Sequence, residues 1–95
     1  MMDEKKIICD AIQTYGKQNQ LVVAVEEMSE LQKEITKALR GCVNVWNMAE
    51  EIADVEIMLE QLKEIYMLHD LSDTYKASKL DRLERRIMAK RGGKE

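Results

Sequence analysis

The chain has 95 residues, of which 45% are hydrophobic and 35% charged, and its net charge is -3. This balance suits one domain over residues 1–95 with a small apolar core, and it offers no uniformly positive surface for a nucleic-acid backbone. No apolar run reaches the length of a membrane span, and the stretch MMDEKKIICDAI has charges within its apolar part, unlike a signal peptide. We therefore expect a cytoplasmic protein without nucleic-acid or membrane partners, in which Cys9 and Cys42 are reduced thiols.

The absence of proline and the abundance of helix-forming residues predict an all-α fold, built as a four-helix bundle with short connections. Apolar residues at helical spacing predict a first helix over residues 3–15, ended by Gly16. The same spacing predicts a long second helix over residues 18–40, ended by Gly41.

The second half of the chain is expected to form two further helices. Asn47, followed three residues later by Glu50, is typical of a capping box and predicts a third helix that ends near residue 69. A fourth helix is expected to start at residue 72 or 73 and to end in a frayed tail over residues 91–95. A small core made from several helices with polar gaps in it buries little apolar surface alone, so we expect a homodimer or homotetramer to complete the core.

Acidic side chains gather on one flank of the second predicted helix. With Met28 at the centre of the apolar stripe and about 100° per residue, Glu27, Glu30 and Glu34 fall together on that flank. The basic residues of this segment fall on the opposite flank: Lys33, Lys37 and Arg40. We therefore expect one acidic and one basic side instead of alternating ion pairs.

The third predicted helix carries an acid inside its apolar stripe. Glu51 lies about 40° from the centre of the stripe at Val55, and Asp54 lies about 60° from Glu51. An ionised carboxylate in an apolar setting costs on the order of several kcal/mol unless it is protonated, paired with a base or bound to a metal. The nearest base on this helix, Lys63, lies beyond the stripe. A divalent cation shared with the acidic flank is the better complement.

Four carboxylates can meet between these two helices: Glu27, Glu30, Glu51 and Asp54. They offer hard oxygen ligands, which suit Mg²⁺ or Mn²⁺. For one acidic pair alone, surface acids and a salt-bridged core residue would be the simpler explanation. Two pairs on neighbouring helices, one of them facing inward, favour the metal site.

The two acidic motifs read EEMSE over residues 26–30 and EEIAD over residues 50–54. Their pattern and spacing resemble the MazG-like nucleoside triphosphate pyrophosphohydrolases, and the resemblance covers residues 15–86. It implies a MazG-like bundle that uses Mg²⁺ to hydrolyse an NTP or dNTP between the α and β phosphates, giving the monophosphate and pyrophosphate. It also implies that the four carboxylates are the catalytic metal ligands, with Glu27 or Glu30 as a candidate general base. The first acid of each motif, Glu26 or Glu50, would contribute less directly to metal binding and catalysis.

Substrate contacts are expected from polar, aromatic and basic residues near the motifs. Gln20, Trp46 and Asn47 are candidates for hydrogen bonding to the base or stacking on it. The candidates for phosphate contacts are Lys76, Lys79 and Arg82. Simpler roles stay open as well, because Trp46 can fill a core or an interface and Asn47 can cap its helix.

Two other functions stay open. A non-catalytic helical module that binds other helices would use Glu51 as a specificity device, and Mg²⁺ would not alter its stability. A nucleotide sensor would keep the metal site without turnover. A ferritin-like di-iron bundle is excluded because it needs ExxH pairs, and the only histidine, His69, has Tyr66 where the glutamate would stand.

Overall fold

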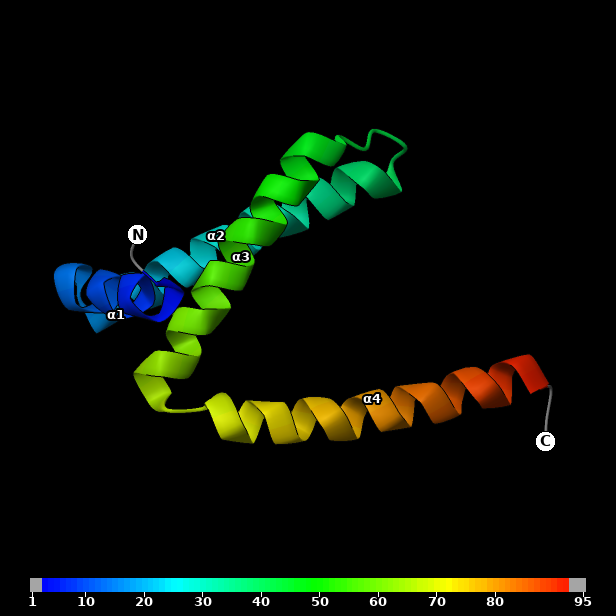
Figure 1. The fold of residues 1–95 in the computed structure, drawn as a ribbon. Coiled ribbons are helices and arrows are strands. Elements are labelled where there is room, and N and C mark those ends of the chain that lie inside the picture. Colours follow the sequence, from blue (N-terminus) through cyan, green and yellow to red (C-terminus); the bar gives the residue numbers. More distant parts are fainter. Residues whose placement is uncertain (1–2, 93–95) are drawn as a thin grey trace.

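The computed structural model describes residues 3–92, which form four α-helices and no strand (Figure 1). The helices are α1 (Glu4–Tyr15), α2 (Lys17–Leu39), α3 (Val45–Tyr66) and α4 (His69–Gly92). The predicted all-α class is confirmed. Of the predicted frayed tail, residues 91 and 92 are helical, and residues 93–95 lie outside the described part. Within residues 3–92, no helix combines the length and the apolar character needed to cross a membrane.

The junction between α1 and α2 is a single glycine. The Asp3 side chain accepts a hydrogen bond from the Lys6 backbone N–H and starts α1. Gly16 has φ 92°, and its N–H donates to the Ile12 carbonyl oxygen at 2.9 Å. Side chains with a Cβ rarely adopt this conformation, so glycine lets α1 stop and α2 begin with one residue between them.

The start of α3 differs from the prediction. Asn44 is the N-cap, because its side-chain oxygen accepts a hydrogen bond from the Asn47 backbone N–H at 3.0 Å. Asn47 is therefore the donor in this cap and lies inside the helix, and the predicted capping box of Asn47 with Glu50 is wrong. Both asparagines have the side chain that a cap needs, and the extended backbone of Asn44 decides between them.

The end of α3 also differs from the prediction. Met67 adopts a left-handed conformation with φ 56°, which ends α3 after Tyr66, and α4 begins at His69. The predicted start at residue 72 or 73 is wrong because Ser72 already donates its N–H to the Leu68 carbonyl at 2.8 Å, inside the first turn. A methionine gives no sequence signal for a left-handed residue, a position that usually takes glycine or asparagine.

Helices α2 and α3 form an antiparallel hairpin, and α1 packs against its open end (Figure 1). The apolar side chains buried there are few: Ile8, Ala24 and Met58. Two polar residues complete the packing, since Gln20 Nε2 donates to Gln61 Oε1 at 2.8 Å and both side chains are buried. The three helices therefore form a small bundle with a mixed core. Cys9 is a half-buried free thiol of α1, and Cys42 is an exposed free thiol in the connection between α2 and α3.

Helix α4 leaves this bundle. It contacts α3 at its start and then extends away from the other helices, and none of its residues is buried (Figure 1). A single chain therefore does not form the expected compact four-helix bundle. The physical reason is the Met67 break, which directs α4 away from α1 and α2 instead of folding it back onto them. The Leu80 and Leu83 side chains are consequently exposed within the chain.

Candidate metal centre

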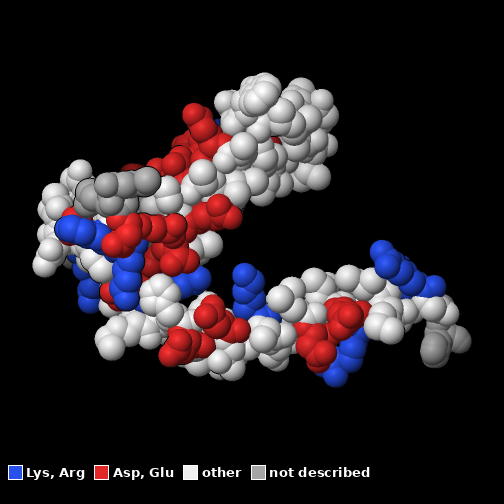
Figure 2. All heavy atoms as spheres, viewed as in Figure 1, with Lys and Arg blue, Asp and Glu red and all other residues white. Residues whose placement is uncertain are grey.

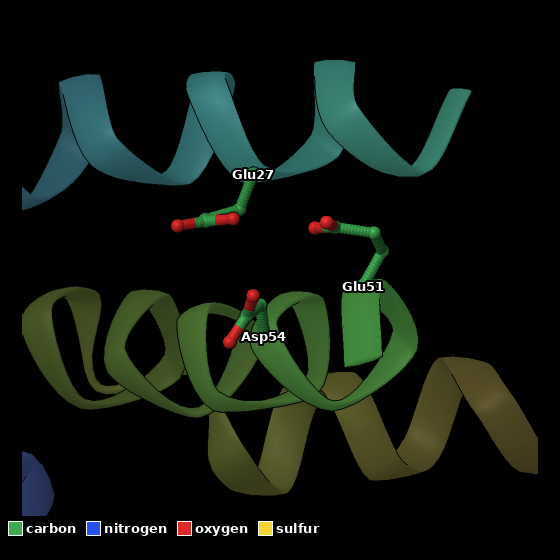
Figure 3. Close-up of side chains that lie close together, drawn as sticks. All are labelled: Glu27, Glu51 and Asp54. Atoms are coloured by element: carbon green, nitrogen blue, oxygen red, sulfur yellow. The ribbon is translucent and has the colours of Figure 1, made fainter. Parts of the chain in front are cut away.

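Three carboxylates meet between α2 and α3. Glu27 extends from α2 toward Glu51 and Asp54, which extend from successive turns of α3 (Figure 3). One oxygen atom of each residue lies within 4.8 Å of the others. The i, i+3 spacing of Glu51 and Asp54 brings both onto the side of α3 that faces α2.

The environment of this cluster disfavours negative charge. Burial raises the pKa of Glu51, and the charges of Asp54, Glu27, Glu30 and Glu34 raise it further. The pKa of Glu27 is raised in the same way, first by burial and then by Asp54, Glu30 and Glu26. Mutual repulsion of this kind is relieved when the carboxylates bind protons or a cation.

Within residues 3–92, no basic side chain neutralises the three acids. The lysines nearest in sequence are paired elsewhere, Lys33 with Glu30 at 3.6 Å and Lys37 with Glu34 at 3.3 Å. In addition, Glu51 Oε1 is buried and has no hydrogen-bond partner among the described residues. A buried, unpaired carboxylate oxygen beside two further carboxylates is a donor set that fits a hard divalent cation.

Glu30 lies at the edge of this cluster and is not one of the three acids that meet. Its carboxylate forms an exposed ion pair with Lys33, although its charge contributes to the raised pKa values of Glu27 and Glu51. The expected separation of α2 into an acidic and a basic side is wrong. Residues three apart on a helix lie only about 60° apart, so flexible lysine side chains reach back to the acids.

Glu34 is the acid that the ligand prediction left out. It is 7% exposed, and its Oε1 atom is buried without a hydrogen-bond partner among the described residues. Its other oxygen, Oε2, pairs with Lys37. Its charge also raises the pKa of Glu51, so it lies near the cluster. The sequence feature that could have included Glu34 in the prediction is its position one turn after Glu30, on the same flank of α2.

The residues predicted to contact a base lie in three different settings. Gln20 is buried and hydrogen bonded to Gln61, which engages it in the packing of α2 on α3. Trp46 is 81% exposed in the first turn of α3, so it does not fill the core of the single chain. Asn47 is exposed beside it, with its backbone N–H bound to the cap residue Asn44.

The basic residues of α4 are not brought to the carboxylate cluster. Lys76 borders a groove with Glu56 and Glu60 of α3, which lie about 140–180° around the helix from Glu51. Lys79 and Arg82 are exposed farther along α4. The leading acids of the two motifs are also exposed: Glu26 and Glu50.

Comparison of the chain with protein-family models, with curated proteins and with solved structures finds no match. The fold and the site therefore define the class of this protein by its structure alone. It is a small all-α protein whose antiparallel helix hairpin carries an internal carboxylate cluster.

Proposed function

We propose that this protein is a Mg²⁺-dependent nucleoside triphosphate pyrophosphohydrolase of the MazG-like kind, cleaving NTP or dNTP to the monophosphate and pyrophosphate. One observation carries the proposal: Glu27, Glu51 and Asp54 bring oxygen atoms within 4.8 Å of one another, and one Glu51 oxygen is buried without a partner among the described residues. The same three residues belong to the two acidic motifs that resemble that family.

The three carboxylates are the proposed holders of the metal ion. Mg²⁺, when bound, supplies positive charge that screens the triphosphate from these acids, stabilises the leaving pyrophosphate and acidifies a bound water. Mn²⁺ prefers similar oxygen ligands. The residues themselves provide a fixed acidic wall, because α2 and α3 hold it from two sides (Figure 3).

A carboxylate beside the metal ligands can take the proton of the attacking water. Glu30 is best placed for this role, since it lies outside the group of three yet close enough to raise the pKa of Glu27 and Glu51. Its ion pair with Lys33 is exposed, with the two side chains 50% and 60% accessible, so breaking that pair costs little.

The test is an assay of pyrophosphate release from a panel of ordinary and modified NTPs and dNTPs in the presence of Mg²⁺. Glu51→Gln removes one charged ligand and should lower kcat/KM by about 10²-fold or more, because a metal contributes several kcal/mol. Glu50→Gln, a change of the adjacent exposed acid, is the matched control and should retain activity. Absence of pyrophosphate release from every substrate would refute the enzymatic proposal.

A non-catalytic helical interaction module is the second candidate. The observation in its favour is the apolar surface that the chain exposes, for example at Val25, Trp46 and Met67, which are 67%, 81% and 87% accessible. Such a module would neither release pyrophosphate nor gain stability from Mg²⁺. A nucleotide sensor would gain stability from Mg²⁺ with nucleotide but would release no pyrophosphate, so the same assay and a melting curve separate all three functions.

A further inference from the structure

Helix α4 carries an apolar stripe that its own chain does not cover. Leu80, Leu83 and Ile87 follow one another at i, i+3 and i+7, which places them on one face of the helix. Their side chains are 55%, 48% and 41% exposed, and no residue of α4 is buried. Contacts with α3 at the start of the helix leave this part of α4 extended away from the bundle (Figure 1).

A groove of about 760 Å³ lies where α1, α3 and the start of α4 meet. Its apolar side chains include Ile7 of α1 and Ile57 and Leu59 of α3, all of them exposed within the single chain. Its charged lining residues are three glutamates and two lysines: Glu4, Glu56, Glu60, Lys63 and Lys76. The groove lies on the side of α3 away from the carboxylate cluster, so it is a separate surface from the candidate metal centre.

The bundle that carries the groove and the helix that carries the stripe have opposite net charge. Residues 3–68 contain thirteen Asp and Glu against seven Lys and Arg, whereas residues 69–92 contain seven Lys and Arg against four Asp and Glu. Within α4, Arg85 pairs with Asp81 at 3.1 Å, and at the start of the helix His69 Nε2 lies 3.4 Å from Glu64 Oε1 of α3. Figure 2 shows acidic side chains over much of the α1–α3 bundle, with basic ones among them, whereas the end of the hairpin seen in this view is mostly uncharged. A basic helix with an apolar stripe is thus complementary to an apolar groove in which glutamates outnumber lysines and which belongs to an acidic bundle.

We propose that this groove receives the C-terminal half of α4 from a second copy of the chain, in a reciprocal two-fold dimer whose α4 helices run antiparallel. Lys76, in the second turn of α4, already borders the groove. In an antiparallel pair of α4 helices, the C-terminal half of the partner's helix lies beside the N-terminal half of this chain's helix, and therefore beside the groove. Two-fold symmetry means that the same contact is made twice. Each copy covers the apolar stripe of the other. The proposal does not depend on the nucleotide chemistry.

The oligomeric state of the full chain tests the proposal first. Sedimentation velocity should give twice the chain mass of 11.0 kDa at micromolar concentration. Leu83→Asp introduces a charge into the stripe and should raise the dimer dissociation constant at least about 100-fold, whereas Ser78→Asp, about 140° away on the same helix, should leave it unchanged. A monomeric wild-type chain, or equal dissociation by both variants, would overturn the proposal.

Two further measurements test the position of the interface. Glu56→Lys changes the groove rim at an exposed site, where folding is not at risk, and should also weaken the dimer. This variant decides the question if circular dichroism shows that Leu83→Asp has not folded. A photo-crosslinking benzoylphenylalanine at position 83 should attach to peptides that contain Ile7 or Ile57. Attachment to the hairpin tip around Trp46, or an unchanged dimer in Glu56→Lys, would show that α4 does not occupy the groove.

Discussion

Gln20 and Gln61 are joined by a buried hydrogen bond of 2.8 Å, and the same hairpin register brings Glu27 opposite Asp54. Moving seven residues forward along α2 from Gln20 reaches Glu27, and moving seven residues back along α3 from Gln61 reaches Asp54. Because the helices are antiparallel, one register fixes both pairs, two turns apart. The amide pair and the carboxylate cluster therefore depend on the same alignment of α2 and α3.

The first prediction concerns this amide pair. Gln20→Ala leaves the buried Gln61 amide without its donor, which should lower the free energy of unfolding by about 1–3 kcal/mol. Replacing both residues by leucine removes both polar groups and should cost less than the single change. Urea denaturation measures the difference, and Gln18→Ala at an exposed site of α2 is the control. If the single and control variants unfold at the same urea concentration, the hydrogen bond does not stabilise the hairpin.

The second prediction concerns the pH dependence of stability without metal. In the folded state, the pKa values of Glu27 and Glu51 are raised above their ordinary value of 4.5. Between pH 4.5 and these raised pKa values, the folded chain therefore binds more protons than the unfolded chain. Stability from these two groups is fully present below pH 4.5 and is lost as the pH rises through the folded pKa values. Urea midpoints across this window should fall more steeply for the wild type than for Glu51→Gln. Parallel slopes for the two proteins would contradict the prediction.

The third prediction concerns metal binding. Mg²⁺ or Mn²⁺ should stabilise the folded chain, by about 2.7 kcal/mol when the metal concentration is one hundred times its Kd. Since bound metal displaces protons from the cluster, the stabilisation should increase as the pH rises. Melting temperatures with and without metal measure the effect, with Glu27→Gln as the loss variant and Glu26→Gln, an exposed neighbour, as its control. Equal metal effects in the two variants would place the ion elsewhere.

The fourth prediction tests the position of the α3 cap. Asn44→Ala removes the side chain that accepts a hydrogen bond from the Asn47 N–H and should lower stability by about 0.5–2 kcal/mol. Asn47→Ala leaves that bond intact, because Asn47 contributes its backbone, and should change stability by less than about 0.5 kcal/mol. Thermal unfolding of both variants checks the order. The opposite order would restore Asn47 as the cap.

The sequence by itself determined the all-α class, the first helix and the inward position of Glu51. These features follow from local properties: helix propensity, the spacing of apolar residues, and the fixed rotation per residue of a helix. The rotation of about 100° per residue predicts that Glu51 lies beside Val55, and this prediction uses no information about the neighbouring helix. The same rotation predicts that Glu34 lies on the acidic flank of α2, although no local sequence feature indicated that Glu34 would be buried.

Only the tertiary structure decided which acids meet and where α4 goes. The hairpin register joins Glu27 with Glu51 and Asp54, and it leaves Glu30 at the edge with Lys33. The direction of α4 depends on one left-handed residue, Met67, whose side chain gives no signal for that conformation. Both outcomes depend on packing between segments far apart in the chain, and helical periodicity describes each segment only with respect to its own axis.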